Sequence, residues 1–204
     1  MPAEPAAKAR LFVLSGPGGV GKDAVLKQMK AAGFRIHYPV TATTRPIRRG
    51  EVNGVDYHFL SREEFERMLA EGSFLEHAQV YGNHYGVPKS EVQEPMARGD
   101  DVLLKVDVQG AETVREMTPD AIRIFLAPAS HADLQRWLEA RVQETAEPPE
   151  ALRVRLQKAE DEMAFAGEFD YVVYNRNGEL EAAVAEIERI IETERARSRE
   201  SEPV

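Results

Sequence analysis

The residues best suited to chemistry near the start of the chain are a cluster of glycines that ends in a lysine, Gly16-Pro17-Gly18-Gly19-Val20-Gly21-Lys22. Glycines allow several backbone N–H groups to turn toward one anion, and the lysine adds a positive charge beside it. A short apolar run precedes the cluster and a helical pattern follows it, so the helix N-terminus adds a partial positive charge. We therefore predict a phosphate-binding loop in which Lys22 contacts the terminal phosphates of a ligand.

The residue after Lys22 departs from the usual pattern. Serine or threonine normally stands there and places a hydroxyl on Mg²⁺, whereas this chain has Asp23. At about 5 Å and an effective dielectric constant of about 20, its repulsion by one phosphate charge is on the order of 3 kcal/mol. An uncompensated Asp23 would therefore weaken phosphate binding.

Lys105 offers a compensating charge. It stands two residues before Asp107 on a predicted strand, so both side chains point to the same side. In phosphate-loop proteins an acid on a neighbouring strand helps to hold Mg²⁺ beside the loop. We expect Lys105 to pair with Asp23 and to leave one carboxylate oxygen free for Mg²⁺; the alternative is two unrelated substitutions.

The elements that would position these residues alternate between strands and helices. The apolar runs predict strands over 11–15, 102–106, 121–127 and 171–174. The helical patterns cover 22–32, 61–71, 109–117, 132–144, 151–165 and a C-terminal helix with Leu180, Val184, Ile187 and Ile191 on one face. Strands separated by helices indicate an α/β fold with a parallel sheet covered on both faces.

The pattern predicts a single domain over residues 9–199 with two interruptions of its core. The core would comprise 9–40, 98–130 and 166–199, with a β-rich substrate-binding insertion over 41–97 and a helical lid over about 131–165. The lid would include an acidic, proline-broken loop at 144–150.

Composition excludes several classes of function. The net charge of −9 argues against a surface built to bind nucleic acid, and the lack of cysteine excludes disulfides, thiolate metal sites and cysteine nucleophiles. No apolar run approaches the length that spans a membrane, so we expect no membrane partner and a cytoplasmic location.

Four segments resemble guanylate kinases, in the order in which that family has them. They are TATTRPIRRGEVNGVDYHFLSREEF (41–65), EHAQVYGNHYG (76–86), KVDVQGA (105–111) and EFDYVVYN (168–175). The resemblance extends from about Arg10 to Ile191. It implies a P-loop NTPase three-layer fold with a central parallel sheet, an inserted β-rich GMP-binding subdomain and a helical lid. It also implies ATP and GMP as substrates, Mg²⁺ as cofactor, a role in purine metabolism, and a monomer or homodimer.

The resemblance also implies roles for individual residues. It places Gly16, Pro17, Gly18, Gly19, Val20, Gly21, Lys22 and Asp23 on the ATP phosphates, Asn175 near the adenine, and Lys22, Arg141 and Arg155 at the transferring group. It places Thr41, Arg45, Arg48, Tyr57 and Tyr85 on the GMP phosphate, and Glu76 and Asp107 on the guanine. Asp23 would be the protein's contact to Mg²⁺.

The chemistry agrees with these roles. A phosphate dianion suits the planar donors of Arg45 and Arg48, which leave one loop. The pairing edge of guanine carries N1–H and N2–H₂ donors, which carboxylates accept. Adenine has a bare acceptor at N1, and an unpaired polar group there costs about 1–3 kcal/mol.

Some positions depart from the family. Val87 stands where a hydroxyl usually reaches guanine O6, and the lid has Ala140-Arg141-Val142 in place of Gly-Arg-Gly. Two other functions therefore stay open. The Gly-Lys-Asp ending also resembles ribose bisphosphate kinases, and an inert guanylate-kinase-like module could bind phosphorylated partners without catalysis.

Overall fold

The structure is a computed structural model of the chain, and it describes residues 9–80, 82–144, 148 and 150–200. The chain divides into two compact units, which we describe separately. The first unit comprises 1–11, 36–104 and 112–121, and the second comprises 12–35, 105–111 and 122–204. Most of the loop expected at 144–150 lies outside the described residues.

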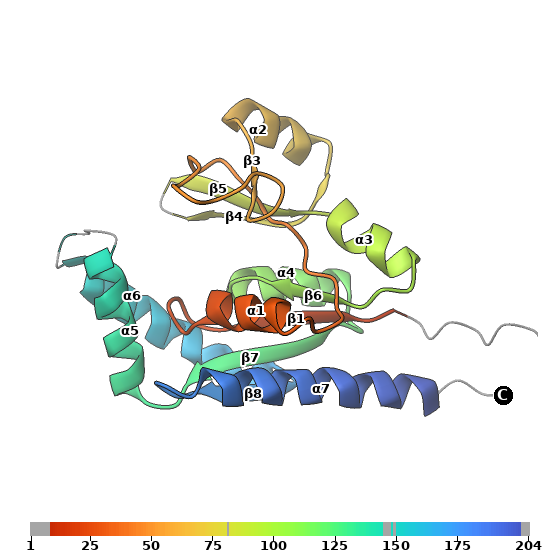
Figure 1. Cartoon of the computed structure of the whole chain (residues 1–204). Coiled ribbons are helices and arrows are strands. Elements are labelled where there is room, and N and C mark those ends of the chain that lie inside the picture. The colour runs from red at the N-terminus through yellow and green to blue at the C-terminus, as the bar shows by residue number, and fades with distance from the viewer. Residues whose placement is uncertain (1–8, 81, 145–147, 149, 201–204) are drawn as a thin grey trace, which may run out of the picture. The chain divides into compact units, whose positions relative to one another are not determined.

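The central sheet has the strand order β6-β1-β7-β8. Its strands are β1 (Leu11–Ser15), β6 (Val102–Lys105), β7 (Ile122–Pro128) and β8 (Tyr171–Asn175). β7 pairs in parallel with β1 on one side and with β8 on the other (Figure 1). Neighbouring strands are distant in sequence, so crossovers join them, as the alternating pattern predicts. The predicted parallel α/β fold is confirmed.

Side chains of β7 pack on both faces of this sheet. Phe125 and Ala127 join Val108 in one cluster, against which Met163 and Phe169 pack. The alternating residues of the strand, Ile124 and Leu126, are fully buried on the opposite face. Strands buried on both faces are the rule in parallel sheets, and they explain why β1 and β7 are continuous apolar runs.

The helices of the second unit cover this sheet. They are α1 (Lys22–Ala31), α5 (His131–Glu144), α6 (Glu150–Met163), the 3₁₀ helix η1 (Ala164–Glu168) and α7 (Leu180–Glu200). α7 packs on α1 and on β8, beside which it runs in Figure 1. α5 packs on α6 through Leu134, Leu138 and Ala159. The helix α4 (Val108–Met117) follows β6.

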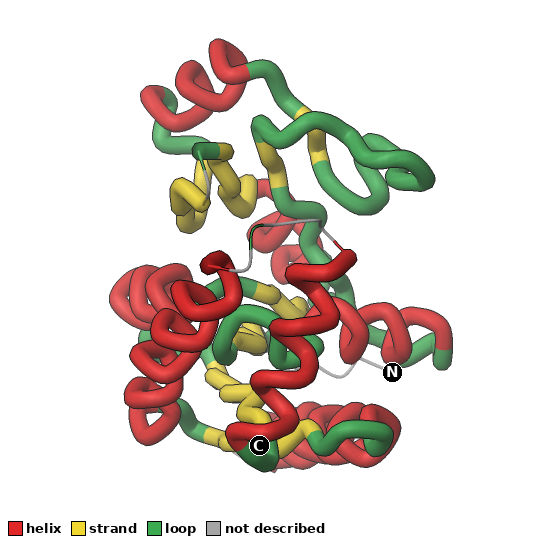
Figure 2. The backbone as a smooth tube through the Cα atoms, turned by 90° about the vertical axis from the view of Figure 1, so that its left-hand side faces the viewer, coloured by secondary structure: helices red, strands yellow, loops and turns green. Residues whose placement is uncertain are grey.

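The first unit has a second, smaller sheet with the strand order β3-β2-β5-β4. These strands are β2 (Ala42–Thr43), β3 (His58–Phe59), β4 (Phe74–Val80) and β5 (Asn83–Pro88), and the helices of this unit are α2 (Arg62–Ala70) and α3 (Ser90–Ala97). The loop between β2 and β3 is far longer than either strand (Figure 2). This sheet agrees with the predicted β-rich subdomain.

Local signals account for one of these helices and fail for the other. Ser61 and Glu64 form the predicted capping box at the start of α2, which buries Phe65 against Phe74. α3 was not predicted, because Pro95 lies inside it and proline normally ends a helical pattern. The helix has only eight residues, and it buries Val92 and Pro95.

Two glycines of the phosphate loop provide a matched test of this packing. Gly16 has φ +140°, and a Cβ there would lie 2.1 Å from the Leu126 carbonyl oxygen, whereas a Cβ at Gly18 would meet nothing within 4 Å. We expect Gly16→Ala to lower the free energy of unfolding by about 2–4 kcal/mol, because backbone strain and a steric clash combine. Gly18→Ala should change it by less than about 0.5 kcal/mol. Urea denaturation measures both, and equal stabilities would contradict the close approach.

Candidate functional site

The phosphate loop has the backbone geometry that an anion site requires. Gly19 and Gly21 have φ values of +85° and +100°, which other residues adopt only with strain. Lys22 starts α1, and its ammonium donates to the carbonyl oxygens of Gly16 at 2.5 Å and Pro17 at 3.1 Å. The loop therefore holds its own lysine against its backbone, at the position where phosphates bind in proteins with this loop.

Asn175, at the end of β8, hydrogen-bonds to the backbone of the phosphate loop. Its side chain is buried, and its Nδ2 donates to the Val20 carbonyl oxygen at 2.8 Å. A Cβ at Gly21 would lie only 2.8 Å from the same nitrogen. Because a buried amide fixes the loop backbone here, Asn175 positions the phosphate loop; its contact with adenine stays a prediction.

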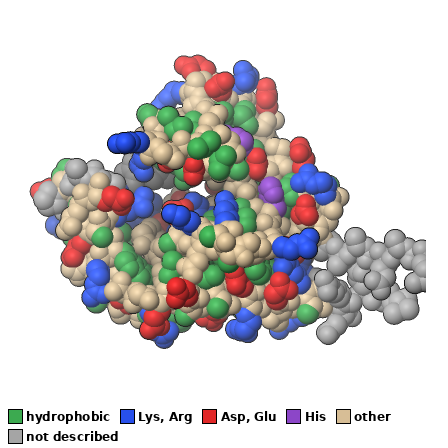
Figure 3. Space-filling view, viewed as in Figure 1, with side chains coloured by type: hydrophobic (Ala, Val, Ile, Leu, Met, Phe, Trp, Pro, Cys, Tyr) green, Lys and Arg blue, Asp and Glu red, His purple; other side chains and the backbone are tan. Residues whose placement is uncertain are grey.

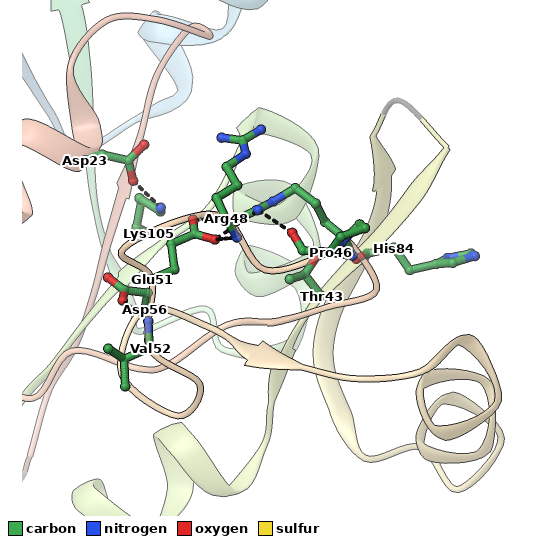
Figure 4. Close-up of polar contacts among 10 residues, drawn as sticks. Asp23, Thr43, Pro46, Arg48, Glu51, Val52, Asp56, His84 and Lys105 are labelled. Atoms are coloured by element: carbon green, nitrogen blue, oxygen red, sulfur yellow. Dashed lines mark hydrogen bonds and ion pairs between the residues drawn. The ribbon is translucent and has the colours of Figure 1, made fainter. Parts of the chain in front are cut away.

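Asp23 and Lys105 form an ion pair. The Lys105 ammonium donates to Asp23 Oδ1, and Figure 4 shows the two side chains pointing toward each other. The Lys105 side chain is only 24% exposed, whereas that of Asp23 is 73% exposed. The predicted pairing is confirmed, and the second carboxylate oxygen of Asp23 remains accessible to a further ligand.

Opposite charges balance one another around the loop. Desolvation lowers the pKa of Lys22 to about 8, although Glu162, Asp23 and Asp107 act in the other direction. Desolvation acts to raise the pKa of Asp23, but Lys105 outweighs it and the pKa is lowered. At both Lys22 and Asp23, neighbouring opposite charges therefore act against the effect of desolvation on the pKa.

Glu162, from α6, reaches the phosphate loop and was not found from the sequence. Its Oε2 accepts the Gly18 N–H at 2.9 Å, and its Oε1 lies 3.6 Å from the Lys158 ammonium. Its side chain is only 12% exposed. Glu162 stands in a run of acidic residues on a polar helix, so no pattern in the sequence distinguishes it from a solvated acid.

The two expected lid arginines lie on α5 and α6. Arg141 lies on α5 one turn after Leu138, and its charge helps to lower the pKa of Asp23. Leu138 approaches the loop so closely that a Cβ at Gly19 would lie 2.6 Å from its Cδ2. Arg155 lies half-buried on α6. Packing on the loop therefore places Arg141 near the charged groups that surround it.

In the first unit, Arg45 is held by a carboxylate. Its two terminal nitrogens donate to the two oxygens of Glu51 at 3.0 and 2.8 Å, and this pairing raises the pKa of Arg45. The Arg48 backbone N–H donates to the same carboxylate at 2.7 Å (Figure 4). Glu51 therefore links both predicted arginines, and sequence reasoning missed it because it looks like any acid in a charged loop.

Two predicted tyrosines gather beside Arg45. The Arg45 guanidinium carbon lies 5.3 Å from the centre of the Tyr57 ring, which meets the Tyr85 ring edge-on at 6.2 Å. The Thr41 carbonyl accepts the His58 N–H, so Thr41, which directly precedes β2, lies beside the start of β3. The structure thus brings Arg45, Tyr57 and Tyr85 together.

The two predicted guanine-reading acids have different surroundings. Glu76 on β4 is buried and lies opposite Val87 in the strand register, so both side chains emerge on one face. Asp107 belongs to the second unit, where its Oδ1 accepts the Gly110 N–H at 2.8 Å at the start of α4. One oxygen of Asp107 is therefore engaged in capping a helix.

Charges of both signs lie on the surface of the chain. Acidic and basic side chains are interspersed over the face that Figure 3 shows. With a net charge of −9, the chain must bind an anion by local arrangement of donors. Within the described residues no helix is long and apolar enough to cross a membrane.

Comparisons with known proteins agree with this site. A strand of a parallel sheet, then a glycine loop that ends in lysine, then a helix is the arrangement of P-loop nucleotide-binding proteins. The guanylate kinase family profile matches residues 8–194. The guanylate kinase of Symbiobacterium thermophilum is 44% identical over 97% of this chain and 90% of its own length. That of one strain of Thermus thermophilus is 44% identical over 94% of this chain and 83% of its own length.

A solved structure of a guanylate kinase is also similar to this chain. The crystal structure of guanylate kinase from Anaplasma phagocytophilum has a TM-score of 0.72 and 33% identity, and the match covers 93% of this chain and 87% of that one. This chain therefore belongs to the guanylate kinase family.

The lowered pKa of Lys22 predicts proton uptake when phosphates bind. At pH 8 the Lys22 amine is about half protonated in the nucleotide-free chain. A bound polyanion favours the charged form, so we expect uptake of about 0.5 proton per ATP. Below pH 7 Lys22 is charged in both states, and the uptake should vanish. ATP affinity should accordingly fall as the pH rises through 8.

Calorimetry in buffers of different ionisation enthalpy measures this uptake. Lys22→Arg is the matched control, because the guanidinium stays charged and should show no uptake at any of these pH values. A binding enthalpy at pH 8 that is independent of the buffer would show that the Lys22 ammonium is already fully charged.

Proposed function

We propose that this chain transfers the γ-phosphate of ATP to GMP, with the roles given below for its residues. The observation that carries the proposal is the phosphate loop, with its glycines and Lys22 in place, in a chain that matches guanylate kinases over nearly its whole length. An inert binding module would not need this loop. A ribose bisphosphate kinase would not need the arginine, tyrosine and acid set of the first unit.

The acceptor phosphate would be held by Arg45, Arg48, Tyr57, Tyr85 and Thr41. Arg45 is already held in a two-oxygen pairing by Glu51, so its fork is oriented before any ligand binds. The phosphate would add to this arrangement at the remaining donors and at the tyrosine hydroxyls. Glu51 is therefore a positioning residue.

Glu76 and Asp107 would select guanine by accepting from its N1–H and N2–H₂ groups. Glu76 is buried, so an unpaired acceptor facing it would carry the full cost of desolvation, about 1–3 kcal/mol. Val87 offers no hydrogen bond beside Glu76. The acids therefore carry the preference for guanine over adenine without help from this position.

Phosphoryl transfer needs charge stabilisation and alignment more than covalent chemistry. Lys22 would stabilise the β- and γ-phosphates of ATP, and Arg141 and Arg155 the charge on the transferring group. The GMP phosphate is already an adequate nucleophile, so no general base is assigned.

The residues beside the loop fit a Mg²⁺ ion. Mg²⁺ in such sites is bound by one or two carboxylates together with substrate phosphates and water, and it neutralises charge on the phosphates. Asp23 supplies one accessible carboxylate oxygen, while Lys105 holds the other. Within the described residues no cluster of three or more His, Cys, Asp or Glu side chains could hold a metal ion.

The activity is tested by coupled ADP release from MgATP with GMP, AMP, CMP, UMP and ribose 1,5-bisphosphate. We expect turnover with GMP and little with AMP, because the acids at 76 and 107 oppose the adenine N1 acceptor. Turnover with ribose 1,5-bisphosphate alone would establish the sugar kinase. Binding of GMP without any turnover would establish the inert module.

The Asp23–Lys105 pair predicts coupled effects of mutation. Lys105→Ala leaves the Asp23 carboxylate uncompensated beside the phosphates, so the affinity for MgATP should fall about tenfold or more. Asp23→Ser with Lys105→Asp restores the usual hydroxyl and acid, and should bind MgATP better than Lys105→Ala alone. Titrations of each variant with ATP, in the presence and in the absence of Mg²⁺, measure these affinities.

A double-mutant cycle isolates the coupling, with Asp23→Ser and Lys105→Asp as the single changes. The expected outcome is a non-additive sum, in which Lys105→Asp is more harmful when position 23 keeps its aspartate than when it carries serine. Independent, additive effects would refute the coupling.

A further inference from the structure

Glu162 accepts a hydrogen bond from the phosphate loop, which binds ATP in the proposed function. Its Oε2 accepts the Gly18 N–H at 2.9 Å, the type of contact that a phosphate oxygen makes with such a loop. The side chain is only 12% exposed, so the carboxylate is held at the loop. Nothing in the roles assigned above uses this residue.

The charges around Glu162 are those that a phosphate would meet. Among the neighbouring charges, Glu162 has the largest effect on the pKa of Lys22, and it favours the protonated form. Glu162 therefore partly offsets the desolvation of Lys22, as a bound phosphate would. A carboxylate carries a single charge and a nucleotide several, so the nucleotide can compete for the same donors.

A second partner for the displaced carboxylate is already in place. Lys158 lies one turn earlier on α6, with its ammonium 3.6 Å from Glu162 Oε1. Arg155 lies seven residues before Glu162, which is two helical turns, so both leave the same face of α6. The contact that Glu162 makes with the loop therefore also restrains the helix that carries Arg155.

We propose that Glu162 is an internal competitor for the ATP phosphates, bound to the loop in the nucleotide-free chain and displaced by ATP. The inference rests on the proposed function, in which this loop binds ATP. Displacement gives up the Gly18 contact and transfers the carboxylate to Lys158, so this contact between α6 and the loop is lost only when the loop is occupied. The apparent association constant for ATP is the intrinsic constant multiplied by the fraction of molecules in which the loop is free of Glu162.

The test is calorimetric titration of MgATP into the full chain without GMP. Glu162→Ala removes the competitor and should bind ATP about tenfold more tightly. Glu162→Asp keeps the charge but shortens the side chain, and should bind ATP a fewfold more tightly because the carboxylate no longer reaches Gly18. Glu160→Ala is the matched control on the same helix, since Glu160 pairs with His131 at 3.1 Å, and it should leave the affinity unchanged within twofold.

A second measurement reports the contact itself. Amide hydrogen exchange at Gly18 in the nucleotide-free chain should be faster in Glu162→Ala than in the wild type, and ATP should slow it in both. If Glu162→Ala fails to fold, Glu162→Gln removes the charge with little change of shape and should shift the ATP affinity in the same direction.

The outcomes separate this inference from the proposed function. Unchanged or weaker ATP binding by Glu162→Ala, in a protein whose wild type binds ATP, would overturn the competition and leave the proposed function intact. A wild type that binds no ATP would overturn both.

Discussion

The phosphates of a nucleotide must be held by a chain whose own charge is −9. The structure meets this constraint by collecting charges of both signs around one glycine loop. The cations are Lys22, Lys105 and Arg141, and the carboxylates are Asp23, Asp107 and Glu162. Desolvation lowers the pKa of Lys22 to about 8 even with these carboxylates beside it. The carboxylates therefore favour the charged form of Lys22 while no nucleotide is bound.

In the first unit, too, a carboxylate contacts groups that are expected to bind a phosphate, but its proposed effect on binding is the opposite of that of Glu162. Glu51 pairs with Arg45 through both oxygens and also accepts the Arg48 N–H, which orients donors in advance of a ligand. Glu162 accepts the Gly18 N–H, for which we propose that ATP competes. Glu51 leaves the Tyr57 and Tyr85 rings beside Arg45, whereas Glu162 accepts the Gly18 N–H itself. We therefore propose that Glu51 orients donors for the acceptor phosphate and that Glu162 competes with ATP.

Sequence patterns predicted the parts of this site that local signals encode. The glycine loop, the strand before it and the helix after it follow from residues 11–32 alone. The Asp23–Lys105 pair was predictable because each residue breaks the expected charge at positions that the fold brings together. Glu162 and Glu51 were not predictable, because their importance depends on contacts that no local pattern records. Asn175 and Val20 meet across 155 positions of sequence, so the supporting role of Asn175 also required the structure.

Helices α5 and α6 are tied to the loop by different kinds of contact. Leu138 of α5 packs so closely on Gly19 that no Cβ fits between them. Separating the two residues would leave a cavity, and a polar ligand would not fill it favourably. Glu162 of α6 is tied by a hydrogen bond and by charge, both of which a phosphate supplies equally well. Apolar packing thus holds α5 against the loop, whereas Glu162 of α6 contacts it through a polar group. Because α5 and α6 also pack on each other, we propose that ATP exchanges the Glu162 contact alone and leaves the packing of the two helices in place.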